Sequence, residues 1–322
     1  MKHNFITSNA MTPALVTGLF NTGLFVAGLF TLGMVTPACA EWVDVVADGM
    51  LEFHSDSNIN RSAFTVDERD DNVASAQLSA GRYFQFNPDG ARYTRLRLTA
   101  DLELRAHDEF DGLDRTNIGI TASLTHKLGL GPDQPWVRAH VSALHESVDD
   151  ADRDKEIYNL GLLAGKQITE RFGASFDVSY NIHDGKDDLA AISTALGGPN
   201  VGSEVYDLDR YILSANASYQ LYHNWLLSGF YSYLGGELNG ECTVPNVVTV
   251  IQTIEVTALA PDQVFGGCRY RFDGSAQTIG LAGTYAISAH SSINFGLAIS
   301  EGGRGDLEYD DERYFANYRY SH

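Results

Sequence analysis

The chain has 322 residues, a length that suits one large β-barrel and exceeds that of a small disulfide-stapled scaffold. Its 42 acidic residues outnumber its 22 lysines and arginines, and the net charge of -20 excludes a non-specific grip on nucleic acid phosphates. Glycine (31), tyrosine (16) and phenylalanine (16) are abundant and proline (8) is scarce, a balance typical of long paired strands.

The first forty residues predict an export signal. Lys2 supplies a positive start, a long apolar stretch follows, and Ala38-Cys39-Ala40 forms a small-x-small cleavage site before Glu41. A transmembrane helix is disfavoured because Asn21 and several glycines interrupt the apolar run. We therefore expect a signal peptide over residues 1–40 and one folded domain over residues 41–322.

Cleavage near Ala40 would leave two cysteines, Cys242 and Cys268, in the mature chain. An even pair of cysteines in an exported protein, where the compartment is oxidising, is most simply a disulfide. The sequence therefore predicts a Cys242–Cys268 bond.

After Glu41, no segment approaches the roughly 18 unbroken apolar residues of a membrane helix. The hydrophobic pattern instead has a period of two. Residues 95–106 place apolar or small side chains on one face and polar or charged side chains on the other. Strict alternation of this kind predicts a strand with one apolar and one polar face.

Twelve segments of the chain show this alternation. They lie near residues 42–56, 73–87, 91–108, 115–129, 136–148, 155–168, 173–184, 206–221, 225–238, 269–288, 291–302 and 311–321.

The connections between these segments alternate between short and long. The short connections lie at 87–90, 129–135, 169–172, 222–224 and 289–290, and the long or strongly polar ones at 57–72, 109–114, 149–154, 185–205, 239–268 and 303–309. Tight periplasmic turns and long extracellular loops are typical of outer-membrane barrels, in which an even strand number returns both ends to the periplasm. We expect an all-β fold, a closed antiparallel transmembrane barrel of about 12 strands, in the outer membrane of a Gram-negative bacterium.

The last strand adds a resemblance to a known class. Tyr314, Ala316, Tyr318 and Tyr320 alternate towards the C-terminus. This pattern is similar to the insertion signal of bacterial outer-membrane barrels, the porin-like class, although His322 stands where that class usually ends in Phe. The resemblance implies that outer-membrane lipid and the barrel-assembly machinery are partners of the chain. The same tyrosines also suit an interfacial aromatic girdle.

A second resemblance covers only the first hairpin. The run Ser55-Asp56-Ser57-Asn58-Ile59-Asn60-Arg61 resembles the start of the barrels carried by surface lipoprotein assembly modifiers and similar export-linked outer-membrane proteins. It implies an export-assisting role as an alternative to transport.

The polar face of two predicted strands carries charges of both signs. The candidate pore-lining residues are Arg95, Arg97, Asp101, Glu103, Arg105, Arg138, His140 and Glu146. Charges that ring a narrow pore set its ion selectivity, whereas charges that pair across a small barrel fill it. The sequence does not distinguish an open pore from a barrel that is plugged by paired charges.

The long connections carry acidic clusters and one apolar stretch. The acidic clusters include Asp67 to Asp71, Asp108 to Asp114, Asp149 to Asp154 and Asp306 to Asp311, and we expect them to be solvated and to favour cations at the mouth. None has the spacing of a calcium loop. The apolar stretch, 239–268, could fold over the pore, pack on neighbouring loops or contact a partner.

We expect no enzyme activity, no catalytic residue, no cofactor and no metal site. His145 and Ser147 share one face of a predicted strand, as a lipid hydrolase would need, but no phospholipase-like motif surrounds them. The preferred function is a porin-like channel for small hydrophilic solutes with a preference for cations. The alternative is a non-conducting structural or export-assisting barrel that uses its outer loops for contact. The solute, any protein partner and the oligomeric state stay open.

Overall fold

The computed structural model describes residues 40–86, 94–129, 131, 133–185 and 204–322. The predicted signal peptide lies outside the described residues apart from Ala40. The predicted turn at 87–90 and most of the predicted loop at 185–205 also lie outside them.

The described residues form thirteen strands. These are β1 (Ala40–Asp56), β2 (Asp71–Phe86), β3 (Thr94–His107), β4 (Arg115–Lys127), β5 (Trp136–Val148), β6 (Lys155–Gln167), β7 (Phe172–Asp184), β8 (Leu208–Tyr222), β9 (Trp225–Cys242), β10 (Val256–Asp262), β11 (Gly267–Ala286), β12 (Ser291–Arg304) and β13 (Leu307–Ser321). Three 3-10 turns, η2 (Asp111–Leu113), η3 (Ala151–Arg153) and η4 (Val244–Asn246), and one helix, α2 (Val247–Thr253), lie in the connections.

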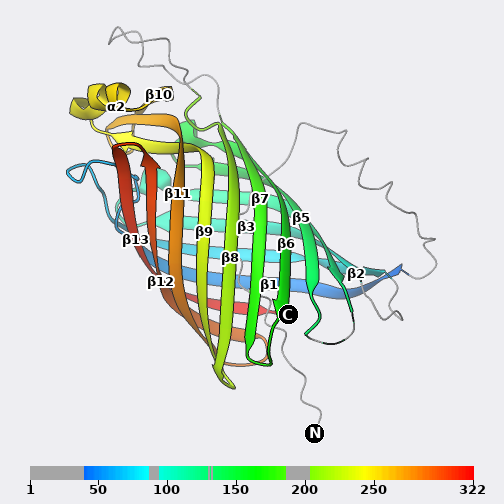
Figure 1. The fold of residues 1–322 in the computed structure, drawn as a ribbon. Helices are drawn as coiled ribbons and strands as arrows, with labels where there is room; N and C mark the ends of the chain where they lie inside the picture. The colour runs from blue at the N-terminus through cyan, green and yellow to red at the C-terminus, as the bar shows by residue number, and fades with distance from the viewer. Residues whose placement is uncertain (1–39, 87–93, 130, 132, 186–203) are drawn as a thin grey trace.

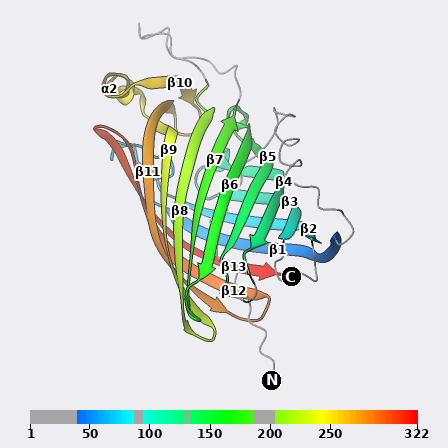
Figure 2. The ribbon, with the colours of Figure 1, turned by 45° about the vertical axis from the view of Figure 1, so that its right-hand side comes forward.

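Twelve of these strands close into an antiparallel barrel. Neighbouring strands in the chain pair from β1 to β9, and β11 to β13 continue the sheet back to β1. Two ladders complete the ring, namely β9 with β11, from Trp225↔Tyr285 to Cys242↔Cys268, and β1 with β13. Figures 1 and 2 show the resulting barrel from two directions. The predicted fold class and all twelve predicted strands are confirmed.

One connection was predicted incorrectly, because residues 239–268 are not a plain loop. The strand predicted to end at residue 238 continues to Cys242, and the next barrel strand begins at Gly267. The short strand β10 pairs with β11 from Val256↔Phe272 to Asp262↔Gly267. The apolar residues of this stretch therefore belong to a small folded unit built on the barrel.

The outward and inward faces of the barrel differ sharply in exposure. Outward side chains such as Leu98 (39% exposed) and Leu162 (57%) are apolar and open. Inward polar groups such as Glu146 (3%) and Asn181 (0%) are buried. This inverts the pattern of a water-soluble protein and suits an exterior in contact with lipid.

No helix within the described ranges is both long enough and apolar enough to cross a membrane.

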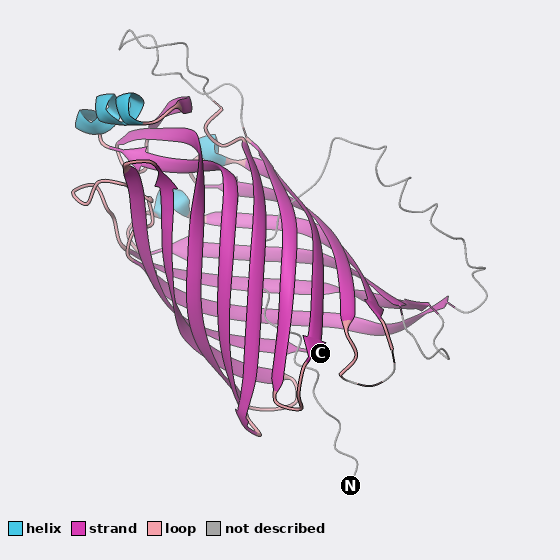
Figure 3. Cartoon of the chain, in the orientation of Figure 1, coloured by secondary structure: helices cyan, strands magenta, loops and turns pink. Residues whose placement is uncertain are grey.

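The two ends of the barrel are unlike. We call the end that carries the β1–β2 connection (57–70) and residues 239–268 the loop end, and the end that carries the tight β8–β9 turn (223–224) the turn end. Helix α2 and β10 gather at the loop end, together with the short 3-10 turns (Figure 3). The last strand, β13, finishes at the turn end (Figure 2).

Gly119 on β4 allows a close approach between neighbouring strands. A Cβ atom at this position would lie 2.1 Å from the carbonyl oxygen of Ala143 on β5. We expect Gly119→Ala to destabilise the refolded barrel by about 1–3 kcal/mol, because the ladder must shift to relieve the overlap. Urea unfolding in lipid vesicles, followed by tryptophan fluorescence, measures the change.

The matched control is Gly49→Ala on β1, where the added Cβ would first meet Leu78 Cδ2 at an ordinary 3.5 Å. Equal stability of the two variants would contradict the steric explanation.

Candidate functional site

All eight predicted pore-lining residues lie at inward positions of two strands. On β3 they alternate with the exposed Leu98, Ala100 and Leu104, and on β5 with the exposed Ala139 and His145. The inward residues are Arg95, Arg97, Asp101, Glu103 and Arg105 on β3, and Arg138, His140 and Glu146 on β5. The interior is therefore polar and carries both signs of charge.

In the half of the interior near the turn end, the charged side chains remain partly open. Arg97 Nη2 lies 2.7 Å from Asp48 Oδ2 on β1, and the two side chains are 26% and 18% exposed. Arg95 donates a hydrogen bond to Gln85 Oε1 at 3.0 Å, and Arg138 Nε donates one to Thr125 Oγ1 at 2.9 Å. Ion pairs that keep contact with solvent hold their partners loosely.

Two further inward residues occupy this half. Asp101 accepts a hydrogen bond of 2.5 Å from the Ser79 hydroxyl on β2. His140 pairs in register with Gly161 on β6, which leaves room for the imidazole because a Cβ on Gly161 would lie 2.3 Å from His140 Nε2.

In the half near the loop end, the inward charges form ion pairs. Glu146 is only 4% exposed at its side chain, and its carboxylate lies 2.5 Å from Lys155 Nζ and 3.3 Å from Arg115 Nη1. Glu103 and Arg105 pair at 2.9 Å on the same strand. Buried ions need such partners because the loss of hydration is otherwise uncompensated. We call the group around Arg97 the open level and the group around Glu146 and Lys155 the closed level; Arg105 and Arg115, at the edge of the closed level, keep 22% and 27% of their side chains exposed.

Beyond the closed level lies the folded stretch 239–268, which we call the mouth insertion. It comprises the end of β9, η4, α2, β10 and the start of β11. Cys242 and Cys268 form a disulfide at its base, where they face each other in the β9–β11 ladder with Cα atoms 5.2 Å apart. The predicted disulfide is confirmed.

The mouth insertion reaches the opposite wall of the barrel. In the strand order, the β3–β4 hairpin lies half a turn of the barrel away from β9 and β11. Nevertheless, the Phe265 ring lies 4.7 Å from the ring of Phe110 in the β3–β4 connection. Twelve strands spaced about 4.8 Å apart and tilted by about 40° enclose a barrel roughly 24 Å across. The insertion therefore spans the mouth.

Arg153, in η3 between β5 and β6, holds the insertion in place. Its guanidinium contacts Asp262 of β10, Glu241 of β9 at 3.4 Å and its own neighbour Asp150 at 3.1 Å. Burial alone lowers the pKa of Arg153, but Glu241 and then Tyr206 and Asp262 raise it, so that its pKa lies above the ordinary arginine value. Arg153 is therefore charged and fully paired.

Tyr206, just before β8, connects this ion-pair network to the interior. The cationic groups of Arg153, Lys155 and Arg269 lie 5.8, 5.8 and 5.0 Å from the centre of its ring. Cations attract the negative face of an aromatic ring, most strongly where water is excluded. Lys155 also pairs with Glu146, so the insertion and the closed level of the interior form one continuous network.

The β1–β2 connection supports the other side of the insertion. Asp67 accepts hydrogen bonds from Thr243 Oγ1 at 3.1 Å and from Asn246 Nδ2 at 2.7 Å. Nearby, ten buried residues form an apolar cluster against which Ala63 and Phe64 pack. The cluster consists of Leu238, Cys242, Val247, Val250, Ile254, Leu259, Cys268, Tyr270, Phe272 and Leu307.

Several acidic residues that were expected to be solvated are structural, so that expectation is wrong for them. Asp71 accepts hydrogen bonds from the backbone N–H groups of residues 108 and 109, both at 3.1 Å. Asp114 and Asp154 each accept a 2.7 Å bond from a strand-end N–H group. Asp67 and Asp311 are 5% and 6% exposed. Backbone N–H groups in the connections have no partner on a neighbouring strand, and the short aspartate side chains accept their hydrogen bonds instead.

The predicted site residues do not include Arg153, Tyr206, Glu241 and Asp262. One signal was present, because Arg153 is the single cation within the acidic run 149–154. A lone cation among carboxylates that already outnumber it is a candidate for burial in an ion-pair network. Tyr206 and Asp262 carry no such local signal, since their partners are distant in the chain.

The remaining predicted residues lie on the outward face. Tyr314 (59% exposed), Tyr318 (42%) and Tyr320 (43%) alternate with inward residues of β13, and Ala316 shares their face. Their role as an insertion signal stays a prediction. His145 and Ser147 are also outward and exposed, and His145 Nδ1 lies 2.8 Å from Glu156 Oε1.

Comparisons with known proteins give barrels of similar architecture. No family model and no curated protein sequence matches the chain. An outer-membrane channel of Pseudomonas putida F1 is 11% identical, covering 89% of this chain and 100% of its own, with a TM-score of 0.49. The NanC porin is 7% identical, covering 84% and 98%, with a TM-score of 0.43. The β domain of the Bordetella autotransporter BrkA is 11% identical, covering 87% and 100%, with a TM-score of 0.43.

The predicted resemblance to bacterial outer-membrane barrels is confirmed as a resemblance of fold. The weaker resemblance of the first hairpin to lipoprotein assembly modifiers stays a prediction. A shared barrel does not assign a function, since one fold carries many activities.

Removal of the Arg153 charge should release the mouth insertion. In Arg153→Gln, Glu241 would keep Arg269 as a partner, but Asp262 would be left buried without its cation, and an unpaired buried charge typically destabilises by about 3–5 kcal/mol. We expect backbone amides of residues 239–268 to exchange with deuterium much faster in the variant, as measured by hydrogen exchange and mass spectrometry.

The matched control is Arg304→Gln, which removes an arginine whose partner Glu255 is 3.6 Å away and 81% exposed. Exposed pairs contribute little, so exchange should not change. Unchanged exchange in Arg153→Gln as well would show that the ion pairs do not hold the insertion.

Proposed function

We propose that this protein is an outer-membrane channel of a Gram-negative bacterium, porin-like, for small hydrophilic solutes, whose outer mouth is narrowed by the mouth insertion. The observation that carries the proposal is the division of the interior. The Arg97–Asp48 pair near the turn end remains partly exposed, whereas the loop end is covered by one folded segment fixed by the disulfide and Arg153. A polar interior with a loop-built constriction is the arrangement of a selective pore.

The exterior supports a membrane location. Its outward strand positions carry exposed Leu, Ile, Val and aromatic side chains, and the twelve-stranded ring is closed by the β1–β13 and β9–β11 ladders. The apolar side chains suit contact with lipid. The closed sheet is needed because exposed backbone groups have no hydrogen-bond partner in a hydrocarbon layer. In this orientation the turn end faces the periplasm and the loop end faces outwards, after removal of a signal peptide near Ala40.

The acidic balance supports a preference for cations. The chain carries a net charge of -20, while the interior presents arginines and carboxylates together. The negative potential therefore comes mainly from the whole protein and its loops rather than from one ring of side chains. Such a potential raises the local concentration of cations at the mouth.

A non-conducting barrel is the second candidate, and one observation favours it. Glu146, Lys155 and Asn181 lie in the interior near the loop end with little exposed surface. A barrel closed at this level would have a structural or export-assisting role and would use its outer loops for contact. The two candidates differ in whether solutes can pass the closed level.

Removal of the disulfide that restrains the mouth insertion distinguishes these two candidates. We expect the refolded protein to give steady, cation-preferring openings in a planar bilayer under a salt gradient. The double variant Cys242→Ser/Cys268→Ser should conduct more, because a crosslink across 26 residues restrains the insertion by about 3 kcal/mol. Correctly folded protein that is silent with and without the disulfide would contradict the channel and support the non-conducting barrel.

Charge reversal in the open level tests whether it lines the conducting path. Arg97→Glu removes the partner of Asp48 and adds negative charge to the interior. We expect the reversal potential under a salt gradient to move towards stronger cation preference. Lys166→Glu, at an outward position of β6, is the matched control and should leave ion preference unchanged. An equal shift in both variants would show that Arg97 does not line the conducting path.

A further inference from the structure

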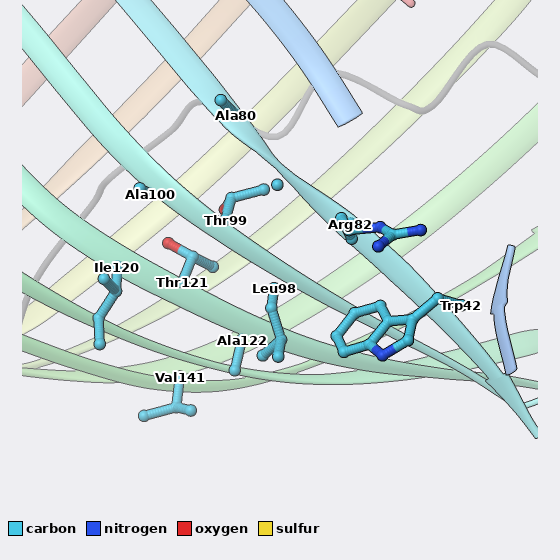
Figure 4. Close-up of a pocket in the computed structure, with 11 residues that line it drawn as sticks. Trp42, Ala80, Arg82, Leu98, Thr99, Ala100, Ile120, Thr121, Ala122 and Val141 are labelled. Carbon is cyan, nitrogen blue, oxygen red and sulfur yellow. The ribbon is translucent and has the colours of Figure 1, made fainter. Parts of the chain in front are cut away.

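The outer surface of the barrel has a groove near the turn end. It crosses β2 to β5, has a volume of about 450 Å³, and is lined almost wholly by apolar atoms. Ala80, Ala100 and Ala122 contribute only methyl groups, whereas larger side chains border the groove (Figure 4). These larger side chains are Trp42, Leu98, Ile120 and Val141. Three small residues on adjacent strands thus leave a depression in the apolar surface.

A cation lies at one edge of this groove. Arg82 occupies an outward, exposed position of β2, in the same alternation as Leu78 and Phe86. Its guanidinium lies 5.3 Å from the centre of the Trp42 ring, and Figure 4 shows the two side chains beside each other. Among the side chains that the structure describes, no carboxylate forms an ion pair with Arg82.

The surroundings of Arg82 place it at the boundary of the apolar surface. Towards the turn end, Trp42, Phe84 and Phe86 form a cluster of edge-to-face rings with centroids 5.2 and 5.1 Å apart. Aromatic clusters of this kind are typical of the level where lipid headgroups begin. In the other direction lies the apolar groove. Arg82 therefore stands between a headgroup level and a hydrocarbon level.

We propose that this groove binds one membrane phospholipid, with its phosphate on Arg82 and an acyl chain along the three alanines. The proposal rests on the membrane location given above but not on conduction. An arginine that faces lipid needs an anionic partner, and a phosphate accepts two parallel hydrogen bonds from a guanidinium. The indole of Trp42 holds the guanidinium in place from one side.

A second copy of the chain fits this surface less well than a phospholipid does. A two-fold contact centred on the groove would bring two Arg82 side chains together, because the same patch faces itself across such an axis. The two guanidinium groups would repel each other in a medium of low dielectric constant. A phospholipid supplies both the anion and the apolar chain that the groove lacks.

Native mass spectrometry of the refolded mature protein in detergent tests the proposal. Dioleoyl phosphatidylglycerol is titrated against the wild-type protein, Arg82→Gln and Ala122→Leu, with dioleoylglycerol as the probe that lacks a phosphate. We expect one tightly retained phospholipid on the wild type, about tenfold weaker retention in Arg82→Gln because a charged hydrogen bond is lost, and weaker retention in Ala122→Leu. Dioleoylglycerol and inorganic phosphate should each bind poorly.

The matched controls are Lys166→Gln and Ala164→Leu, which make the same kinds of change on the outward face of β6, outside the groove. They should retain phospholipid like the wild type. Equal loss in groove and control variants, equal retention of both lipids, or a retained second protein chain would each overturn the site. A barrel that inserts into bilayers but shows no selective retention refutes only this inference. A chain that does not enter bilayers would refute the membrane location as well.

Discussion

The structure depends on one constraint, the closure of a twelve-stranded sheet whose outer face is apolar. An open sheet with this exterior would present unpaired N–H and C=O groups to a medium that cannot bond them. The β1–β13 and β9–β11 ladders remove both edges and force the twelve strands into a ring. Closure also turns every second side chain inwards, so the polar residues that the exterior excludes must share a limited space.

That limited space explains the character of the interior. Arginines and carboxylates at neighbouring inward positions neutralise one another, as Arg97 does with Asp48 and Lys155 with Glu146. Near the turn end, the Arg97–Asp48 pair keeps partial contact with solvent. Near the loop end, the connections add their own polar groups from above, and Tyr206 and Arg153 extend the pairing into the mouth insertion. The closed level and the cover over it are therefore one electrostatic unit.

The sequence predicted the barrel well because alternation is a local property. Each strand shows its own two faces, and the predicted disulfide needed only the count of cysteines. The mouth insertion was not predictable in the same way, since Arg153 and Asp262 are 109 residues apart and meet only after the barrel closes. Arg82 was also not among the predicted site residues, although it interrupts an apolar alternation that runs from Leu78 to Phe86. These sites depend on contacts between residues that are distant in the chain, and the local hydrophobic periodicity does not reveal such contacts.

The position of the disulfide also constrains how the protein is assembled. Cys242 and Cys268 are 26 residues apart and face each other as soon as the local ladder forms, whereas the strands that close the ring bring together residues 273 positions apart, such as Asp48 and Ser321. Loop closure costs more entropy as the separation grows, so bringing the two cysteines together costs less than closing the ring. In the orientation proposed above, a disulfide formed before the ring closes would carry the mouth insertion across the membrane as a cross-linked unit rather than as an extended thread.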